Sequence, residues 1–455
     1  MSAAIDLPTA VRFRARSVAA PRIATTVALT LAGSVALSPA LLPRSAAIQA
    51  ALTGLLLALG MLGAKLWKAL RPSTERSSSA TSLAVAAGGA VLIGSFVLRA
   101  HHWQNDLRTA MGASRIGPDY WVLVLAGGVA VAAALAGTAQ LVGAGLRRAR
   151  ARPRLAALAV SACATACLAV PATPPQLAHA SAVDSSVDRT VARPASPARS
   201  GGPDSLTPWE SLGTHGRRFV AAPAPDSVVR TYVGLASAPD PDARVRLAIR
   251  ELDRAGGFGR SNMVVTVPTG SGWIDADAVA GLERRFDGDV AEVAVQYSAA
   301  PSWATFVFDR NSATESSARL YAAVTEHVSR LAPDRRPRVY LYGQSLGAIG
   351  VAAAAAQPRP APCGAMYAGP PAGTSTVTGA VLANASDPVV WWSPRLLVRP
   401  PRLDAARPDA PRPRWLPVVT FLQTSVDLLS ALNMPTGHGH RYGADQGTAM
   451  PGCTH

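Results

Sequence analysis

A strand-like run that ends at a serine between two glycines places the strongest constraint on how this chain folds. Residues 339–342 are mostly β-branched and aromatic, and an alanine-rich segment suited to a closely packed helix begins directly after Ser345. Gly343 and Gly347 complete a G-x-S-x-G pattern, which five residues can match by chance. Its position between a strand and a helix instead favours a sharp turn that lifts the Ser345 hydroxyl clear of its neighbours. The sequence therefore predicts a nucleophile elbow at Ser345.

The first half of the chain has the composition of a membrane domain. Each of its apolar stretches is close to the roughly 20 residues that cross a bilayer core. Buried helices of a soluble domain would need more covering surface than this half supplies. We expect a multi-span domain over residues 1–172 with about five helices, at residues 23–42, 46–70, 82–98, 120–146 and 155–172.

The net charge of the chain is +16, and the positions of its basic residues predict how the chain is oriented in a membrane. Arginine and lysine clusters precede the first stretch, follow the second and separate the fourth from the fifth. Placing these clusters in the cytoplasm satisfies the positive-inside rule, and an odd number of spans then puts the second half outside the cell membrane. A cleaved signal sequence is the alternative for the first stretch, but residues 38–44 lead straight into more apolar sequence. No nucleic-acid-reading motif is present, so we expect contacts to membrane lipids and no nucleic-acid partner.

A linker rich in Pro, Ala and Ser at residues 173–205 separates the membrane domain from a second domain at residues 206–455. Strand-like and helix-like segments alternate in this second domain, which predicts a doubly wound, mostly parallel α/β sheet covered on both faces. The predicted strands lie at residues 263–268, 290–297, 339–344, 364–368 and 381–384, and predicted helices at 276–286 and 312–331.

A serine nucleophile needs a base and an acid, and the chain supplies both in the order Ser, acid, His. Asp387 follows a predicted strand, where loops converge on an active site, although an aspartate before proline is also a common turn residue. His438 and His440 share a glycine-rich loop. We favour His440 as the base, with His438 as the alternative. Asp404, Asp409 and Asp427 are weaker candidates for the acid.

Backbone amides that bind an oxyanion are predicted at Leu346 and in the loop of Gly270, Ser271, Gly272 and Trp273, and Gln344 is grouped with them as a binding residue. This loop lacks the lysine and the spacing of a nucleotide-binding loop. Nothing beside His438 and His440 completes a metal site, so we expect neither a metal nor an organic cofactor. Trp273, Trp303, Trp391 and Trp392 are candidates for an apolar pocket or for ordinary packing.

The four cysteines are too few for a disulfide framework. Cys163 and Cys167 lie in the fifth apolar stretch. Cys363 and Cys453 belong to the second domain and can pair in an oxidising compartment.

The chain resembles the actinobacterial membrane proteins that join an N-terminal multi-span region to a C-terminal α/β-hydrolase domain. The resemblance implies a serine hydrolase acting on esters, with Ser345, Asp387 and one histidine of the 437–443 loop as its triad. This chain carries Gln344 where the family has Glu, and its segment 369–381 is shorter. The matching motifs are residues 36–44 (ALSPALLPR), 103–104, 213–220 (GTHGRRFV), 232–235 (YVGL), 268–273 (PTGSGW), 296–298, 343–347 (GQSLG), 386–394 (SDPVVWWSP) and 437–443 (GHGHRYG).

Residues and resemblance together predict a membrane-anchored serine hydrolase that cleaves acyl or lipid esters through an acyl-enzyme. A catalytically degenerate hydrolase fold that serves as a membrane scaffold is the alternative. A transporter has little support, because the apolar stretches hold almost no charges.

Overall fold

The structure, a computed structural model, describes residues 22–70, 78–151, 190–358, 360–376 and 379–453. It divides into two compact units. The first contains the chain up to Ser38, Ser45–His102 and Gly117–Val142; the second contains Pro39–Arg44, Trp103–Ile116 and the chain from Gly143 onward.

The first unit is made of apolar helices. It contains α1 (Ile23–Ala36), α2 (Ala46–Leu70) and most of α3 (Ser79–Ala110) and α4 (Pro118–Ala151). By length and composition α2, α3 and α4 are able to cross a membrane. The first predicted span is a helix of only 14 residues, because Pro39 lacks the amide hydrogen and disfavours helix before it. The predicted span at 155–172 lies outside the described residues. Among the described residues, three helices are of spanning length, whereas the sequence predicts about five spans over residues 1–172.

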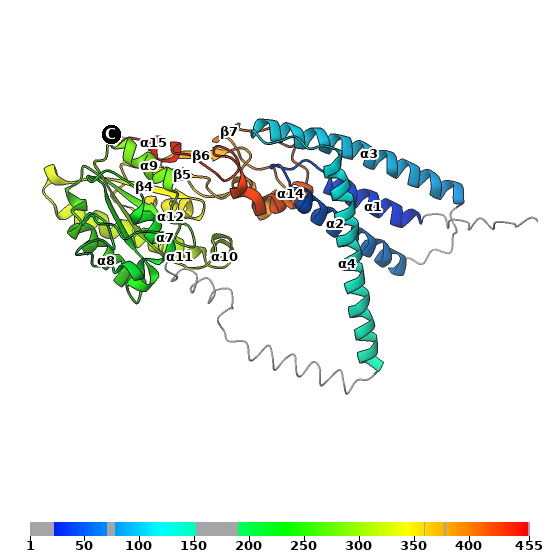
Figure 1. Cartoon of the computed structure of the whole chain (residues 1–455), viewed down its shortest axis with the longest axis horizontal. Coiled ribbons are helices and arrows are strands. Elements are labelled where there is room, and N and C mark those ends of the chain that lie inside the picture. The colour runs from blue at the N-terminus through cyan, green and yellow to red at the C-terminus, as the bar shows by residue number, and fades with distance from the viewer. Residues whose placement is uncertain (1–21, 71–77, 152–189, 359, 377–378, 454–455) are drawn as a thin grey trace, which may run out of the picture. The chain divides into compact units, whose positions relative to one another are not determined.

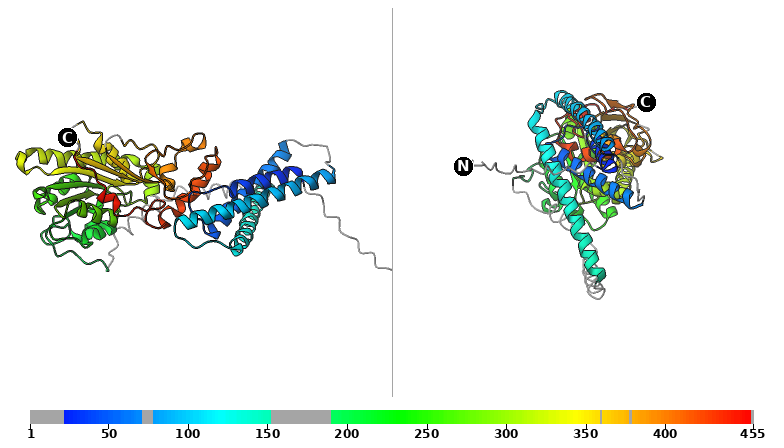
Figure 2. Two further views of the ribbon diagram at one scale, coloured as in Figure 1. Left: turned by 90° about the horizontal axis from the view of Figure 1, so that it is seen from above. Right: turned by 90° about the vertical axis from the view of Figure 1, so that its right-hand side faces the viewer.

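Helices α1 to α4 are drawn in blue to cyan in Figure 2, and small residues allow them to approach closely. A Cβ added to Gly54 of α2 would lie 2.6 Å from the carbonyl oxygen of Gly128 in α4, and one added to Gly60 would lie 3.0 Å from that of Ala28 in α1. Close approach at small residues is how helices associate in lipid. Large apolar side chains such as Leu98 and Leu125 remain exposed, as expected of a surface that faces lipid.

A sheet of seven parallel strands forms the centre of the second unit, in the order β1-β3-β2-β4-β5-β6-β7 (Figure 1). The prediction of a doubly wound parallel sheet is confirmed. The strands are β1 (Val229–Val233), β2 (Asn262–Val267), β3 (Val290–Val295), β4 (Arg338–Gln344), β5 (Gly364–Ala368), β6 (Ala380–Asn384) and β7 (Ala406–Arg407).

Each face of the sheet is covered by its own hydrophobic core, because successive side chains along a strand point to opposite faces. Val265 packs in the core under a first layer of helices, whereas its neighbour Val264 packs in the core on the other face. The helices of the first layer are α8 (Pro241–Arg254), α11 (Arg310–Arg330) and α12 (Leu346–Ala355); α7 (Gly213–Ala221), α9 (Ala276–Arg285) and α15 (Asp445–Thr448) lie on the other face.

Shorter elements connect these layers. They are the helices α10 (Ser302–Phe308), α13 (Pro388–Trp391) and α14 (Val419–Asp427), and the 3₁₀ turns η1 (Trp209–Leu212), η2 (Leu235–Ser237), η3 (Gly257–Gly259), η4 (Pro333–Arg335), η5 (Pro394–Leu397) and η6 (Leu428–Asn433).

The end of the predicted linker packs against β1. Arg199 is buried, and its guanidinium donates to the carbonyl oxygens of Val220 (3.0 Å) and Ala222 (2.6 Å). The amide of Ser200 donates to the carbonyl oxygen of Arg230 in β1 at 3.1 Å. These bonds make residues 199 and 200 part of the α/β unit, although their composition is that of a linker.

The segment Pro39–Arg44 is anchored in the second unit by a buried ion pair. Arg44 is 1% exposed and Asp427, at the end of α14, is fully buried. The Arg44 guanidinium donates to Asp427 Oδ1 at 2.7 and 2.9 Å, and the amide of Leu41 donates to Asp427 Oδ2 at 2.8 Å. Leu41 and Leu42 join a small core with Trp391. The segment Pro39–Arg44 therefore contacts two helices of this unit, α13 through Trp391 and α14 through Asp427.

Cys363 and Cys453 form a disulfide that joins residues 90 positions apart. The pairing that the sequence left open is thus present in the structure. Cys453 follows α15 and attaches this last described segment beside β5, which Cys363 precedes.

Candidate functional site

Ser345 occupies a sharp turn between β4 and α12. Its backbone has φ 55° and ψ −122°, outside the regions that side-chain-bearing residues prefer. The Ser345 amide donates to the carbonyl oxygen of Ala368 in β5 at 2.9 Å, which fixes the turn against the neighbouring strand. Strained serines of this kind are held in place by surrounding structure and concentrate at functional sites.

The flanking glycines are required by close contacts. A Cβ on Gly343 would lie 2.4 Å from the carbonyl oxygen of Gly347, and a Cβ on Gly347 would lie 2.4 Å from that of Val267. No side chain fits at either position without a backbone shift. The start of α12 is consequently pressed against the carboxyl end of β2.

Asp387 lies just beyond β6 and is fully buried. Its carboxylate accepts hydrogen bonds from the amide of Val389 at 2.8 Å, from Tyr442 Oη at 2.6 Å and from His440 Nδ1 at 2.7 Å. Burial and the adjacent Asp387 carboxylate raise the pKa of Tyr442 well above its usual value of 10, so the phenol remains a neutral donor. The carboxylate thus has three donors and no contact with bulk water.

His440 presents its second ring nitrogen away from Asp387. When Nδ1 carries the proton given to Asp387, Nε2 is the unprotonated nitrogen that is able to accept one. The ring is 6% exposed, and the His440 amide donates to the carbonyl oxygen of Ala431 in η6 at 2.9 Å. Both the ring and the backbone of His440 are therefore fixed.

Two contacts bring His440 to the Ser345 turn. The side-chain amide of Gln344 donates to the His440 carbonyl oxygen at 3.3 Å. A Cβ on Gly369 would lie 2.8 Å from His440 Cε1, and Gly369 follows Ala368, the residue that accepts from the Ser345 amide. In the described part of the chain no hydrogen bond joins Ser345 Oγ to His440 Nε2; such bonds commonly tighten only when a substrate is bound.

His438 belongs to a different pair. Its Nδ1 lies 3.1 Å from Asp409 Oδ2, and Asp409 also accepts from the amide of Ser386 at 2.9 Å. Ser386 Oγ in turn accepts from the amide of Gly439 at 2.8 Å. The structure brings His440, and not His438, to Asp387. The second pair ties the histidine loop to the residue that precedes Asp387.

The loop of Gly270 to Trp273 forms a turn at the end of β2. The amide of Gly272 donates to the Thr269 carbonyl oxygen at 2.9 Å, and Tyr232 Oη donates to the Gly272 carbonyl oxygen at 2.9 Å. Among the described residues, the amides of Gly270 and Ser271 donate to no backbone acceptor. Neither does the amide of Leu346, at the first position of α12, which packs against the same end of β2. The sequence-predicted amides therefore lie at one end of the sheet.

The remaining residues predicted for the site differ in their burial and contacts. Gln344 is 3% exposed, and its Oε1 has no hydrogen-bond partner within the described structure. Trp273 is half-buried and its carbonyl oxygen accepts from the Thr269 amide at 2.9 Å. Trp391 and Trp392 border a pocket beyond Asp387. Nothing is described of the Trp303 side chain.

Sequence reasoning missed the contacts of three residues that hold the site. Tyr442 was visible within the 437–443 motif, but no pattern assigned its hydroxyl to Asp387. The side-chain amide of Asn384 donates to the Gly439 carbonyl oxygen at 2.8 Å and secures the histidine loop to β6. Asp409 lies in a stretch rich in Pro and Arg, which gave no local signal of its contact with His438. Within the residues described, His, Cys, Asp and Glu side chains form no group of three able to hold a metal ion.

Comparison with protein families identifies the family to which this fold belongs. Residues 229–381 and 378–451 match a model described as alpha/beta-hydrolase family, and residues 37–223 match the model of the same family's N-terminus. The chain belongs to this α/β-hydrolase family. Comparison with curated proteins and with solved structures gives no match. In this α/β-hydrolase, the N-terminal match begins at residue 37, so it includes the Pro39–Arg44 segment that contacts α14.

Proposed function

We propose that this α/β-hydrolase is a membrane-anchored serine hydrolase that cleaves carboxylic esters through an acyl-enzyme. The observation that carries the proposal is the hydrogen-bonded series Tyr442–Asp387–His440 beside the strained Ser345 turn. A serine nucleophile with a buried carboxylate that orients its base is the arrangement required for acyl transfer.

Each residue has a defined part in the proposed reaction. Ser345 Oγ attacks the acyl carbonyl while His440 Nε2 takes its proton, and His440 then delivers this proton to the leaving alkoxide. Asp387 holds the imidazole in the required tautomer and stabilises its charged form. Water attacks the acyl-enzyme by the same proton path in reverse and regenerates Ser345. His440, the hydrogen-bond partner of Asp387, is thus needed in both halves of the reaction.

The oxyanion that forms on the acyl carbonyl needs donors already in place. The amides of Leu346 and of the Gly270–Ser271 turn are proposed for this role, since they lie at the end of β2 and make no backbone hydrogen bond in the described chain. The reaction then needs neither a metal nor a redox group, because every proton and charge has a protein partner.

We infer that the substrate is a lipid-like ester and that the catalytic unit lies on the extracytoplasmic side of a multi-span anchor. Three helices of spanning length support attachment to a membrane. The Cys363–Cys453 disulfide supports an oxidising compartment, since such bonds are rare in the cytosol. The positive clusters beside the apolar stretches favour the same orientation.

Turnover of a series of p-nitrophenyl esters of increasing acyl length by the purified full chain tests the proposal. We expect saturable hydrolysis that falls by about 10³-fold or more in Ser345→Ala, the scale of removing a catalytic nucleophile. Ser329→Ala, which changes an exposed serine on α11, is the matched control and should retain wild-type rates. Hydrolysis that is equal in Ser345→Ala and wild type would disprove the proposal.

A scaffold without activity is the second candidate. It is favoured by one observation, that no hydrogen bond links Ser345 Oγ to His440 Nε2 among the described residues. A folded protein that turns over none of the esters in the series would support this alternative.

A further inference from the structure

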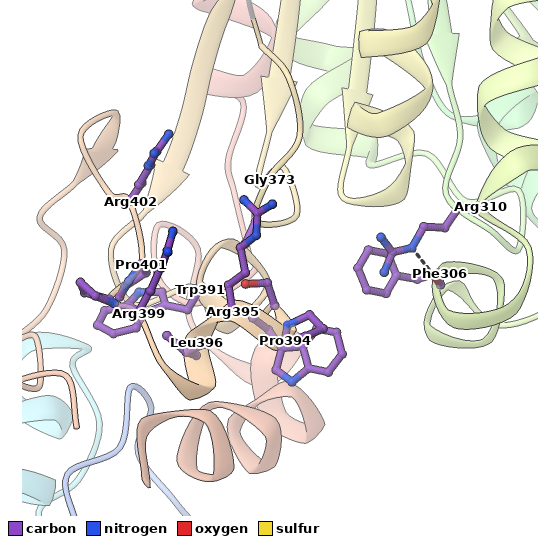
Figure 3. A pocket seen from close by; sticks show the side chains of 14 residues that line it. Phe306, Arg310, Gly373, Trp391, Pro394, Arg395, Leu396, Arg399, Pro401 and Arg402 are labelled. Carbon is purple, nitrogen blue, oxygen red and sulfur yellow. Dashed lines mark hydrogen bonds between the residues drawn. The ribbon is translucent and has the colours of Figure 1, made fainter. Parts of the chain in front are cut away.

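A pocket of about 480 Å³ is lined largely by residues that follow Asp387 in the chain. It is lined by the end of α13, the residues that follow it, the loop after β5 and one side of α10. Figure 3 shows Arg395, Arg399 and Arg402 on one side of it, and Phe306 with Arg310 on the other. Its volume falls within the range of small-molecule sites.

Elements that line this pocket also contact the candidate active site, although Ser345, Asp387 and His440 do not line the pocket. Trp391, in its floor, ends the single-turn helix that Asp387 caps. Ala372 lines it too and lies three residues after Gly369, the residue beside the His440 ring. Three residues span at most about 11 Å, so this wall is near the imidazole.

The helix α10 also connects the pocket to the candidate active site, through the loop that contains Gly270. A Cβ on Gly270, in the proposed oxyanion loop, would lie 2.7 Å from Thr305 Oγ1 of α10. The next residue, Phe306, lines the pocket, and its ring lies 6.1 Å from that of Trp392. A ligand in the pocket therefore lies between α13, which Asp387 caps, and α10, which contacts the proposed oxyanion loop.

The lining combines positive charge with apolar surface. Arg395, Arg399 and Arg402 are exposed and, within the described structure, form no ion pair and donate no side-chain hydrogen bond. No described lining residue is acidic. The floor is formed by Trp391 and Leu396, which are buried. Uncompensated guanidinium groups above an apolar floor are suited to a ligand with an anionic group and a short apolar part.

We propose that this pocket is a subsite for an anionic group, of the phosphate or carboxylate class, carried by the ester substrate. The inference rests on the proposed function and narrows its substrate class to anionic esters. The arginines bind the anionic group, while Trp392 and Phe306 contact the adjoining carbon chain. The ester then extends past α13 toward Ser345. The subsite recognises the substrate molecule itself rather than the surface of an anionic bilayer.

Two water-soluble substrates test the subsite: 1-butyryl-glycerol 3-phosphate and 1-butyryl-glycerol, which differ only in the phosphate. The full chain is used in nanodiscs of neutral phosphatidylcholine. We expect wild type to favour the phosphate ester in kcat/KM. Replacing Arg395, Arg399 and Arg402 together by Gln should lower kcat/KM for the phosphate ester by about 30-fold, or about 2 kcal/mol, the size of one or two charge-assisted hydrogen bonds. The neutral ester should change by less than about threefold, within ordinary mutational scatter.

A matched control removes the same charge elsewhere. Arg246 and Arg250 on α8 and Arg335 on η4 are exposed arginines outside this pocket. Their combined replacement by Gln should leave the ratio of the two kcat/KM values unchanged. An equal loss of the ratio in both triple variants would overturn the subsite, since overall charge would then explain the preference.

Two further outcomes also decide against the subsite. One is a wild type with no preference for the phosphate ester. The other is an effect of the pocket variant that appears only in nanodiscs of anionic phosphatidylglycerol, which would indicate bilayer attraction. If wild type hydrolyses neither ester, calorimetric binding of glycerol 3-phosphate decides: binding lost in the pocket variant supports the subsite although the proposed function has failed, and absence of binding overturns it.

Discussion

Asp387 is the residue at which the contacts of the site converge. It caps α13, accepts from His440 and Tyr442, and has no exposed surface. A buried carboxylate is stabilised only while its donors remain, so each partner of Asp387 affects both the stability of the loop and the orientation of the imidazole.

The two histidines of the loop should differ sharply in their effect on activity. We predict that His440→Ala lowers kcat by about 10³-fold or more, because the proton acceptor is lost. His438→Ala should lower kcat by less than about tenfold, since it removes only a partly exposed contact to Asp409. Steady-state kinetics on a soluble ester measures both. A larger loss in His438→Ala would contradict the assignment.

Tyr442→Phe tests the third donor to Asp387. Loss of this buried hydrogen bond should destabilise the protein by about 1–3 kcal/mol, with a smaller effect on catalysis than His440→Ala. Thermal unfolding and kcat of the same preparation report the two effects. Tyr321→Phe is a control, because its hydroxyl bonds to the Pro360 carbonyl oxygen away from the site. Equal stability of the Tyr442 variant and wild type would show that the Tyr442 hydroxyl contributes little to the free energy of unfolding.

At this scale the sequence predicts the types of residues but not all of their contacts. The motif around Ser345 and the position of Asp387 after a strand are local signals. The choice between His438 and His440 is not local, because Gly439, with φ 54°, turns the chain between them. Asp409 then accepts from one imidazole and Asp387 from the other, a result of folding that no spacing reveals.

Among the elements, strands with continuous apolar runs are the ones that the sequence predicts. Residues 263–268, 290–297 and 364–368 agree with β2, β3 and β5 to within two residues at each end. β1 was missed because Arg230 interrupts its apolar run; in the structure its guanidinium is buried against Glu283 and carbonyl oxygens of residues 219, 222 and 223. β7 has only two residues and pairs through Ala406 and Arg407, too short for any periodic signal.

Glu292 of β3 should make the stability of the sheet depend on pH. Complete burial raises its pKa to about 8, with Arg230 opposing and Glu283 adding to the rise. The folded state therefore keeps this proton between about pH 4.5 and 8 while the unfolded state releases it. Stability should fall as pH rises through this range, by up to about 1.4 kcal/mol per pH unit for one group.

The variant Glu292→Gln isolates that contribution. It should be close to wild type in thermal stability at pH 5 and more stable at pH 8, because the amide carries no charge to bury. Unfolding temperatures of the full chain at pH 5, 6, 7 and 8 measure the difference. A pH slope that is the same in both proteins would show that other groups cause it.

Arg44 should stabilise the catalytic unit from a distant part of the sequence. Arg44→Met leaves the buried Asp427 carboxylate without its cation, and we expect a loss of about 3–5 kcal/mol. The double variant Arg44→Met with Asp427→Asn should recover part of this loss, because no charge remains buried. Thermal unfolding of the two variants is the measurement, and a double variant less stable than Arg44→Met would contradict the ion-pair explanation.

At the scale of the whole molecule, the chain is not divided at one point into a membrane half and a catalytic half. The α/β unit includes Pro39–Arg44 and Trp103–Ile116 as well as the chain from Gly143 onward. Composition separates apolar from mixed segments, but it does not show that a short loop between apolar helices packs within the α/β unit. The predicted boundaries at 172 and 205 remain predictions.

The disulfide should add to the stability of this unit by closing a loop of 90 residues. Replacing Cys363 and Cys453 by Ala should cost about 3–5 kcal/mol, since a long loop gains more conformational freedom when it unfolds. Replacing Cys163 and Cys167 by Ala is the matched control and should leave thermal unfolding unchanged. A wild type whose unfolding temperature is unaffected by a reducing agent would count against this contribution.

The central claim, that Ser345 is a nucleophile activated by His440, is tested most directly by labelling the full chain with a fluorophosphonate and locating the adduct by mass spectrometry. We predict one adduct, on Ser345, that forms in His438→Ala and is lost in His440→Ala. A folded protein that acquires no adduct, or one whose adduct lies on another residue, would contradict the account.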